Sequence, residues 1–158
     1  MRHFLKDEVS FKKLMLLLLF SIGTLSSVLA GTINFSATLS SNQLFYRPRP
    51  GSSVCGGYYG TFTSISANST TQYAYATQSF TVSAAGNYSI TVTSTTASDP
   101  MLLIYNSFSP SSPNSNFKVG DDDSGSGLNS SISGCNNYFA AGTYTIVVTS
   151  YSSYTRSG

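Results

Sequence analysis

The sequence predicts an all-β protein, an antiparallel two-sheet β-sandwich with a jelly-roll-like arrangement and about eight strands. Three observations lead to this fold class. Apolar and polar residues alternate at period two between clusters rich in Gly, Ser, Asn and Pro. Beyond the N-terminal segment, no stretch has the 3.6-residue period of a helix. An apparent turn followed by a strand occurs twice as a sequence repeat.

Residues 1–30 have the pattern of a signal peptide. Basic residues precede an apolar run at 14–22, and Val28, Leu29 and Ala30 form the small-residue pattern that signal peptidase accepts. The apolar run is about half of the ~20 residues that a spanning helix needs, so we expect cleavage before Gly31, with an uncleaved anchor as the alternative. Residues 31–158 are then expected to form one secreted, extracellular or periplasmic domain that does not span a membrane.

The composition of residues 31–158 argues against two function classes. These residues contain four basic and four acidic side chains, so the formal net charge is 0, and no basic stripe predicts a nucleic-acid partner. They contain no His and no Glu, which removes the usual general bases and the imidazole ligands of zinc. We therefore expect no enzymatic activity. An Asp-dependent hydrolase, using Asp99 with one aspartate of 121–123, is the alternative.

The expected strands follow in order along the chain. Alternation predicts strands at 33–39, around Phe62 and Ile65, and at 73–82. The repeat pairs residues 84–94 with residues 140–150, and eight of the eleven positions are identical. Each copy reads as a tight turn that leads into a strand, so we expect two equivalent strands of one antiparallel sandwich.

Residues 99–105 form an unbroken apolar run that is too short for a helix. Such a run predicts a central strand that is buried on both faces. After a Ser- and Pro-rich loop at 106–116, we expect short strands at 117–119 and around Ile132.

Cys55 and Cys135 are the two cysteines of the chain. In an exported protein, two cysteines without a third predict one disulfide, and free thiols or a bond to another chain are the alternatives. In the chain-entropy model, closing a loop of about 80 residues stabilises the fold by ~4.5 kcal/mol.

The stretch VGDDDSGSGLNS, residues 119–130, holds three adjacent aspartates in a chain with few other charges. Because these carboxylates repel one another, a hard cation such as Ca²⁺ is one expected partner, with Asp99, Asp121 and Asp123 as ligands. The stretch does not follow the EF-hand pattern, since Ser126 and Ile132 occupy the Gly and Glu positions. The alternative is a solvated turn in which Asp side chains cap backbone amides.

Several segments, taken in order, resemble the bacterial pre-peptidase C-terminal-like domains over residues 44–158. They are YRP at 46–48, SFTVSAAGNY at 79–88, DPMLLIY at 99–105, DDDSG at 121–125 and AGTYTIVV at 141–148. The resemblance implies an extracellular, non-catalytic β-sandwich of the kind found beside secreted proteases or in cell-surface proteins, with calcium binding in some relatives.

One departure from that family concerns its closing strand. The family pattern places this strand where the present chain reaches Gly158. Either the sequence is truncated, which we expect, or the fold leaves an open groove whose unpaired edge pairs with another chain.

Tyrosines offer a second kind of binding surface. Tyr73 and Tyr75 share one strand face and Tyr151 follows the last predicted strand, so these three are the candidate residues for binding a sugar or polymer. Inward packing is the alternative for Tyr73 and Tyr75. We therefore expect a secreted accessory or surface module for binding, adhesion or targeting, with an extracellular polymer, a cell-surface glycan or a protein as partner. A carbohydrate- or matrix-binding domain is the alternative function.

Overall fold

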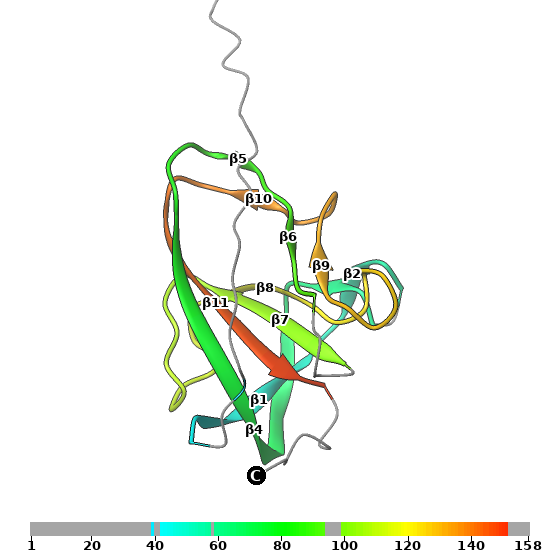
Figure 1. Cartoon of the computed structure of the whole chain (residues 1–158), viewed down its shortest axis with the longest axis vertical. Coiled ribbons are helices and arrows are strands. Elements are labelled where there is room, and N and C mark those ends of the chain that lie inside the picture. The colour runs from blue at the N-terminus through cyan, green and yellow to red at the C-terminus, as the bar shows by residue number, and fades with distance from the viewer. Residues whose placement is uncertain (1–38, 40–41, 58, 94–98, 152–158) are drawn as a thin grey trace, which may run out of the picture.

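The computed structural model describes residues 39, 42–57, 59–93 and 99–151, which contain eleven strands and no helix (Figure 1). The predicted signal peptide and, apart from residue 39, the strand expected at 33–39 lie outside this part of the chain. The strands are β1 Leu44–Pro50, β2 Ser53–Cys55, β3 Thr61–Phe62, β4 Ile65–Val82, β5 Gly86–Asn87, β6 Ile90–Thr91, β7 Pro100–Tyr105, β8 Phe117–Asp121, β9 Ser131–Ile132, β10 Tyr138–Phe139 and β11 Gly142–Ser150.

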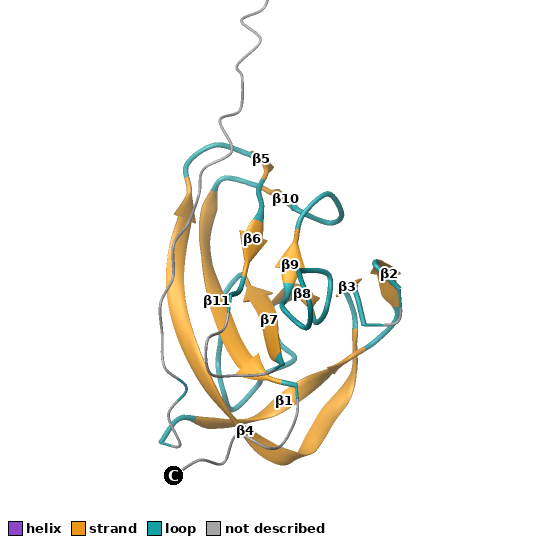
Figure 2. Cartoon of the chain, turned by 45° about the vertical axis from the view of Figure 1, so that its right-hand side comes forward, coloured by secondary structure: helices purple, strands orange, loops and turns teal. Residues whose placement is uncertain are grey.

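Seven of these strands form one strongly curled antiparallel sheet in the order β1-β4-β11-β7-β8-β3-β2 (Figure 2). The other four form two small sheets, β10-β5 and β6-β9. The predicted all-β, antiparallel class is confirmed, whereas the division into strands and sheets differs from the expected eight strands in two sheets. The cause is β4, which is 18 residues long. Its first half pairs with β1 and its second half with β11, so the curled sheet is continuous through this one strand.

Strand β7 is the central strand that the apolar run predicted. It is the fourth of the seven strands, and each of its residues is buried. Leu102 and Ile104 belong to one hydrophobic core cluster, whereas Met101, Leu103 and Tyr105 belong to the other. Because successive side chains point to opposite faces, both faces of the sheet are covered here. Each such apolar side chain contributes about 2 kcal/mol through burial.

Two hydrophobic cores lie on opposite faces of the main sheet. The first lies between that sheet and the two small sheets, which contribute Ile90, Ile132 and Phe139. The second lies inside the curl, where Phe45 of β1 and Phe62 of β3 approach the other face of β7. The small sheets therefore cover the first core, and the curled main sheet encloses the second core.

The sequence repeat encodes a turn and does not fix the strand that follows. In each copy, the Tyr hydroxyl donates a hydrogen bond to a carbonyl four residues upstream, from Tyr88 to Ala84 at 2.7 Å and from Tyr144 to Ala140 at 3.0 Å. Both rings also pack edge-on against Phe139. The second copy continues as β11 in the main sheet, whereas the first is divided into β5 and β6 in the small sheets. The two copies of the repeat are therefore equivalent in their turns, as predicted, but not in the strands that follow.

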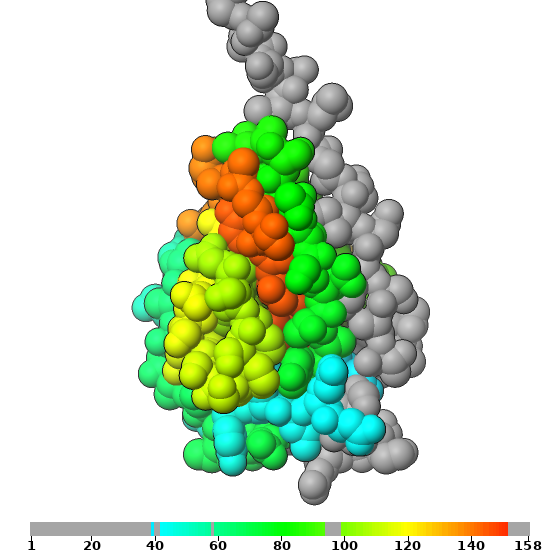
Figure 3. Space-filling model, turned by 90° about the vertical axis from the view of Figure 1, so that its left-hand side faces the viewer, coloured from blue at the N-terminus to red at the C-terminus, as the bar shows by residue number. Residues whose placement is uncertain are grey.

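The outer strands of the main sheet are β1 and β2. Strand β11 lies between β4 and β7 and pairs with both, so the unpaired edge considered from the sequence is not found at β11. Figure 3 shows the face on which β11 runs beside β4, with β1 crossing below them. Pro48 and Pro50 lie in β1, and because proline has no N–H to offer, they make this outer edge a poor template for another strand.

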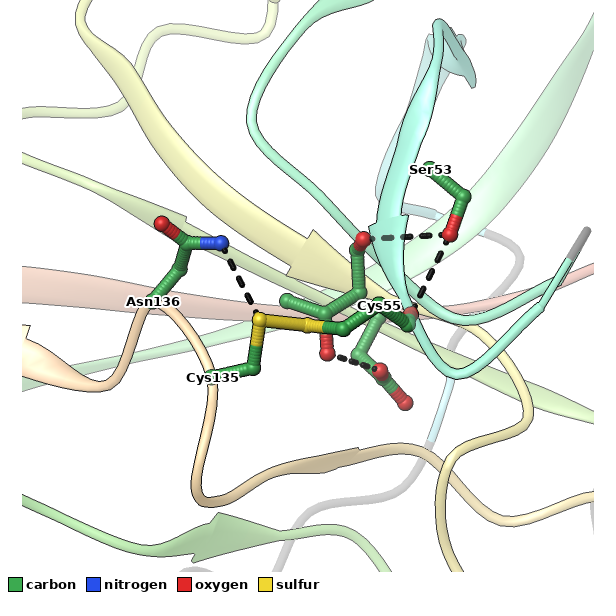
Figure 4. The surroundings of a disulfide bond; sticks show 6 residues. Ser53, Cys55, Cys135 and Asn136 are labelled. Carbon is green, nitrogen blue, oxygen red and sulfur yellow. Dashed lines mark hydrogen bonds between the residues drawn. A yellow bond between two sulfur atoms is a disulfide. The ribbon is translucent and has the colours of Figure 1, made fainter.

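The predicted disulfide between Cys55 and Cys135 is confirmed (Figure 4). It joins β2, at the edge of the main sheet, to the loop between β9 and β10, with a Cα–Cα distance of 6.5 Å. The two cysteines are 80 residues apart, so the bond closes a long loop and ties the edge of the main sheet to the small sheets.

Candidate metal centre and adjoining cleft

Three aspartates meet at one end of the main sheet. Asp99 immediately precedes β7, and Asp122 and Asp123 immediately follow β8. The two strands are antiparallel neighbours in which Leu102 pairs with Asp121, so the start of β7 lies beside the end of β8. One carboxylate oxygen from each of the three residues lies within 4.8 Å of the others. We call Asp99, Asp122 and Asp123 the aspartate cluster.

Asp122 is buried, Asp99 and Asp123 are half-buried, and the cluster is short of hydrogen-bond donors. Asp122 is only 1% exposed, and neither of its carboxylate oxygens has a hydrogen-bond partner in the described part of the chain. Oδ1 of Asp99 and Oδ1 of Asp123 are also buried without a partner there. Buried polar atoms in proteins are nearly always satisfied, because an unpaired one forfeits the free energy of its hydration. Four buried carboxylate oxygens without a hydrogen-bond partner, on three neighbouring residues, are therefore unusual.

Arg47 of β1 supplies positive charge beside the cluster. Its side chain is 5% exposed, and its guanidinium carbon lies 4.6 Å from the ring centroid of Tyr73 and 4.7 Å from that of Tyr151. Nη1 donates to the sulfur of Met101 at 3.3 Å, while the buried Nε has no partner among the described residues. Three carboxylates and one guanidinium leave a formal charge of −2.

The electrostatics of the cluster disfavour ionised carboxylates. Burial raises the pKa of Asp122 to about 8, with a further increase from Asp123 and Asp99, and Arg47 opposes the shift. Burial and then the charge of Asp123 raise the pKa of Asp99, and burial followed by Asp121 raises that of Asp123. Burial also lowers the pKa of Arg47, against the attraction of its neighbours. The single guanidinium thus offsets only part of the repulsion among the carboxylates.

Asp121, which the sequence suggested as a metal ligand, faces away from this cluster. Its Oδ2 accepts a hydrogen bond from the Thr61 hydroxyl at 2.8 Å, and its Oδ1 accepts from the backbone N–H of Ser131 at 2.7 Å and of Ser124 at 3.0 Å. It therefore joins β3, β8 and β9 and caps the turn that follows, as the alternative expected, but it is buried and not solvated.

Asp122 takes the place that the sequence analysis gave to Asp121. Successive residues of an extended chain point to opposite faces, so Asp121 shares the face of Val119 in the first core, and Asp122 takes the opposite one. The pairing of β8 with β7 shifts between Phe117 and Val119, which pack on different cores, so counting alternate residues from Phe117 would not have separated Asp121 from Asp122. Asp99 and Asp123, also expected as ligands, are both brought into the cluster.

A cleft with a volume of about 1270 Å³ adjoins the cluster. Asp99 lines this cleft and also belongs to the cluster, so the two features share a wall. The other lining residues include Arg47, Arg49, Tyr59, Tyr73 and Tyr151. The cleft is therefore both aromatic and charged on the side next to the aspartates.

The three tyrosines singled out in the sequence have different positions. Tyr73 and Tyr151 line the cleft and are half-buried. All three pack against the second core, so Tyr73 and Tyr75 pack inward as the alternative expected. The ring centroid of Tyr75 is 5.0 Å from that of Phe45 and 5.3 Å from that of Phe108, and Tyr75 does not line the cleft. Tyr73 and Tyr75 therefore form no common platform in the cleft.

Tyr59 is a cleft residue that the sequence analysis did not single out. Its carbonyl accepts a hydrogen bond from the N–H of Asp123 at 2.9 Å, and its ring meets Tyr151 edge-on with centroids 6.0 Å apart. The backbone of Tyr151 in turn donates to the carbonyl of Asp99 at 2.8 Å. Two aromatic residues are therefore held by their backbones to two members of the aspartate cluster.

Comparisons with protein-family models, with curated proteins and with solved structures find no match to this chain. Within the described ranges, no helix is long and apolar enough to cross a membrane.

Proposed function

We propose that this chain is a secreted, non-catalytic β-sandwich module, jelly-roll-like and of the pre-peptidase C-terminal-like type, that binds other molecules and holds a calcium ion with Asp99, Asp122 and Asp123. The observation that carries the calcium site is the buried carboxylate of Asp122. Both of its oxygens are buried without a partner among the described residues, and one of them lies within 4.8 Å of a carboxylate oxygen of Asp99 and of Asp123. A divalent cation would supply the positive charge and the coordination bonds that replace the missing hydrogen-bond donors.

The donor set favours calcium over other metals. All three side chains offer hard carboxylate oxygens, which suit Ca²⁺ and Mg²⁺ better than transition metals. Ca²⁺ binds oxygens at about 2.3–2.6 Å and so bridges ligands up to ~5 Å apart, whereas Mg²⁺ at about 2.0–2.1 Å reaches only ~4.2 Å. Oxygens within 4.8 Å of one another therefore suit the larger ion across their whole range. The formal charge of −2 also matches a divalent cation.

The absence of catalysis is supported by the residues of the site. Residues 31–158 contain neither His nor Glu. The oxygens of the aspartate cluster lie within 4.8 Å, closer than the ~6.5–9.5 Å that two carboxyl groups need to hold a water molecule in an inverting glycosidase. One end of the cleft is thus arranged to hold a cation, and its tyrosines and arginines present a surface for contact.

Secretion is supported by the N-terminal sequence pattern and by the disulfide, since such bonds persist in oxidising compartments.

The calcium site is tested by thermal unfolding of chelator-treated protein, with and without added CaCl₂. At a free concentration about 100 times the Kd, the ion stabilises the fold by ~2.7 kcal/mol, which raises Tm by several degrees. We expect Asp122→Asn and Asp123→Asn to abolish this increase. Arg49→Gln, which changes an exposed charge outside the cluster, is the matched control and should retain it. An identical Tm with and without calcium in the wild-type protein would overturn the proposed site.

A further inference from the structure

The coordination of the proposed ion is incomplete, and its open side faces the cleft. Calcium takes 6–8 oxygen ligands, and the cluster brings one carboxylate oxygen from each of three residues within 4.8 Å of the others. Positions therefore remain for oxygens from elsewhere. Asp99 is half-buried and lines the cleft, whereas Asp122 closes the buried side. A molecule in the cleft thus has access to the ion from the side of Asp99.

With calcium bound, the charge of the region favours an anionic ligand. The aspartate cluster contributes three negative charges, and the ion together with Arg47 and Arg49 contributes four positive ones. Arg49 is exposed and lines the cleft, so its guanidinium is accessible to a bound molecule. Arginine pairs with carboxylates in a bidentate geometry. A carboxylate-bearing molecule thus meets a metal ion at one point of the cleft and a guanidinium at another.

Tyrosine rings line one wall of the cleft, and the ring of Tyr59 is exposed to a bound sugar. Tyr59 contacts Tyr151 with ring centroids 6.0 Å apart. Arg47 stacks on Tyr151 at 4.7 Å and on Tyr73 at 4.6 Å. Tyr59 is 47% exposed and presents both an apolar ring and a hydroxyl. The buried guanidinium fixes the rings of Tyr73 and Tyr151 in place.

The remaining lining is polar and the space is large. Ser52 and Ser64 are exposed and line the same cleft, where their hydroxyls can exchange hydrogen bonds with sugar hydroxyls. A volume of about 1270 Å³ exceeds the roughly 300–1,000 Å³ of most small-molecule pockets. The cleft is therefore sized for several sugar units of a chain.

From these observations we propose that the cleft binds an acidic glycan, a chain containing uronic acid units, with a uronate carboxylate completing the coordination of the calcium ion. This inference rests on the proposed calcium site. The exposed ring of Tyr59 contacts a sugar ring, the half-buried Tyr73 and Tyr151 line the wall beside it, and Arg49 binds a second carboxylate along the chain.

The test uses a short oligogalacturonide, the matching neutral galactan oligomer, and isothermal titration calorimetry of the full mature chain. Wild-type protein should bind the oligogalacturonide in calcium and lose at least tenfold in affinity in chelator. The neutral oligomer should bind at least tenfold more weakly than the acidic one. Tyr59→Ala and Arg49→Gln should each weaken binding of the acidic oligomer severalfold. Tyr46→Ala is the matched control, because Tyr46 is 49% exposed and lies outside the cleft lining, and it should leave the affinity unchanged.

Calcium is titrated into the same preparations without glycan, which separates the two proposals. Protein that binds calcium and does not bind the oligogalacturonide overturns the glycan inference and leaves the metal site standing. Protein that binds no calcium overturns both. Equal affinity for the neutral oligomer contradicts the preference for uronic acid units. Binding of the oligogalacturonide that persists in chelator contradicts its coordination to a calcium ion held by the protein. Full affinity in both Tyr59→Ala and Arg49→Gln excludes this cleft as the site.

Discussion

Replacing Asp122 by asparagine should stabilise the protein in the absence of metal, an unusual result for a buried polar residue. The carboxyl group has a pKa of about 8 in the folded state, because burial and two neighbouring carboxylates disfavour its charge. In the unfolded chain the pKa is about 3.9. The folded state therefore binds the proton more tightly. The stability that this proton provides is complete below about pH 4 and is lost as the pH rises toward about 8.

The magnitude follows from this pKa difference. Each pH unit between the two pKa values costs about 1.4 kcal/mol, so at pH 7 the wild-type fold has lost up to ~4 kcal/mol relative to a neutral side chain. The substituted side chain would carry no charge, but its amide would be left without partners at a cost of about 1–2 kcal/mol. We therefore expect Asp122→Asn to raise the free energy of unfolding by about 2–3 kcal/mol at pH 7, and to lower it by about 1–2 kcal/mol near pH 4.

The assay is urea unfolding in chelator at several pH values between about 4 and 8, followed by circular dichroism. The difference between variant and wild type should change sign within this range. The charged groups that act on the pKa of Asp122 are Asp99, Asp121, Asp123 and Arg47, and all four are present in both proteins. A variant that is less stable than the wild type at pH 7 would refute the reasoning, because Asp122 would then have a stabilising partner, such as Arg47, and would not need a cation.

Three further predictions concern the frame around the site. Asp121→Ala should lower the free energy of unfolding by about 3 kcal/mol with or without calcium, because three hydrogen-bond donors lose their acceptor. Urea unfolding measures this change, and an effect confined to calcium-loaded protein would instead make Asp121 a metal ligand. Replacing Cys55 and Cys135 by serine should cost about 4 kcal/mol in the same measurement, and an unchanged stability would show that the bond constrains little. Tyr88→Phe and Tyr144→Phe should each cost about 1 kcal/mol, and a marked difference between them would contradict the equivalence of the two turns.

The parts of the fold that the sequence predicted are those set by local composition. The run at 99–105 has no polar face, so it had to be a strand buried on both sides, and β7 is one. The pair Cys55 and Cys135 followed from the cysteine count in a chain with a predicted signal peptide. The turn of the repeat depends on a tyrosine that bonds four residues upstream, and the same short sequence produces it twice.

The division into sheets depends on contacts between distant segments. β4 passes through the polar stretch Thr70, Thr71 and Gln72, which the alternation pattern did not assign to a strand. These residues remain extended because Gln72 pairs with Tyr46 of β1, across the curl of the sheet. The same applies to the short strands β5 and β6. Their sequence resembles that of β11, yet they pair with β10 and β9 in the small sheets and not with the main sheet.

The candidate site was predictable in part. Three adjacent aspartates indicated the loop that supplies two members of the aspartate cluster, and Asp99 is the third member. Choosing between Asp121 and Asp122 required knowing which way each side chain points at the end of β8. That direction depends on the register shift within β8, which the number of adjacent carboxylates does not reveal. Arg47 was beyond local prediction, since arginine is seldom buried. Its burial depends on two rings, of Tyr73 and Tyr151, that come from distant parts of the chain.

The central claim is that the aspartate cluster binds calcium, and the most direct measurement is a calorimetric titration of chelator-treated mature protein with CaCl₂. The account predicts one ion per chain and an affinity that falls at least tenfold when both Asp122 and Asp123 are replaced by asparagine. The absence of binding, or binding of the same affinity in the doubly substituted protein, would contradict it.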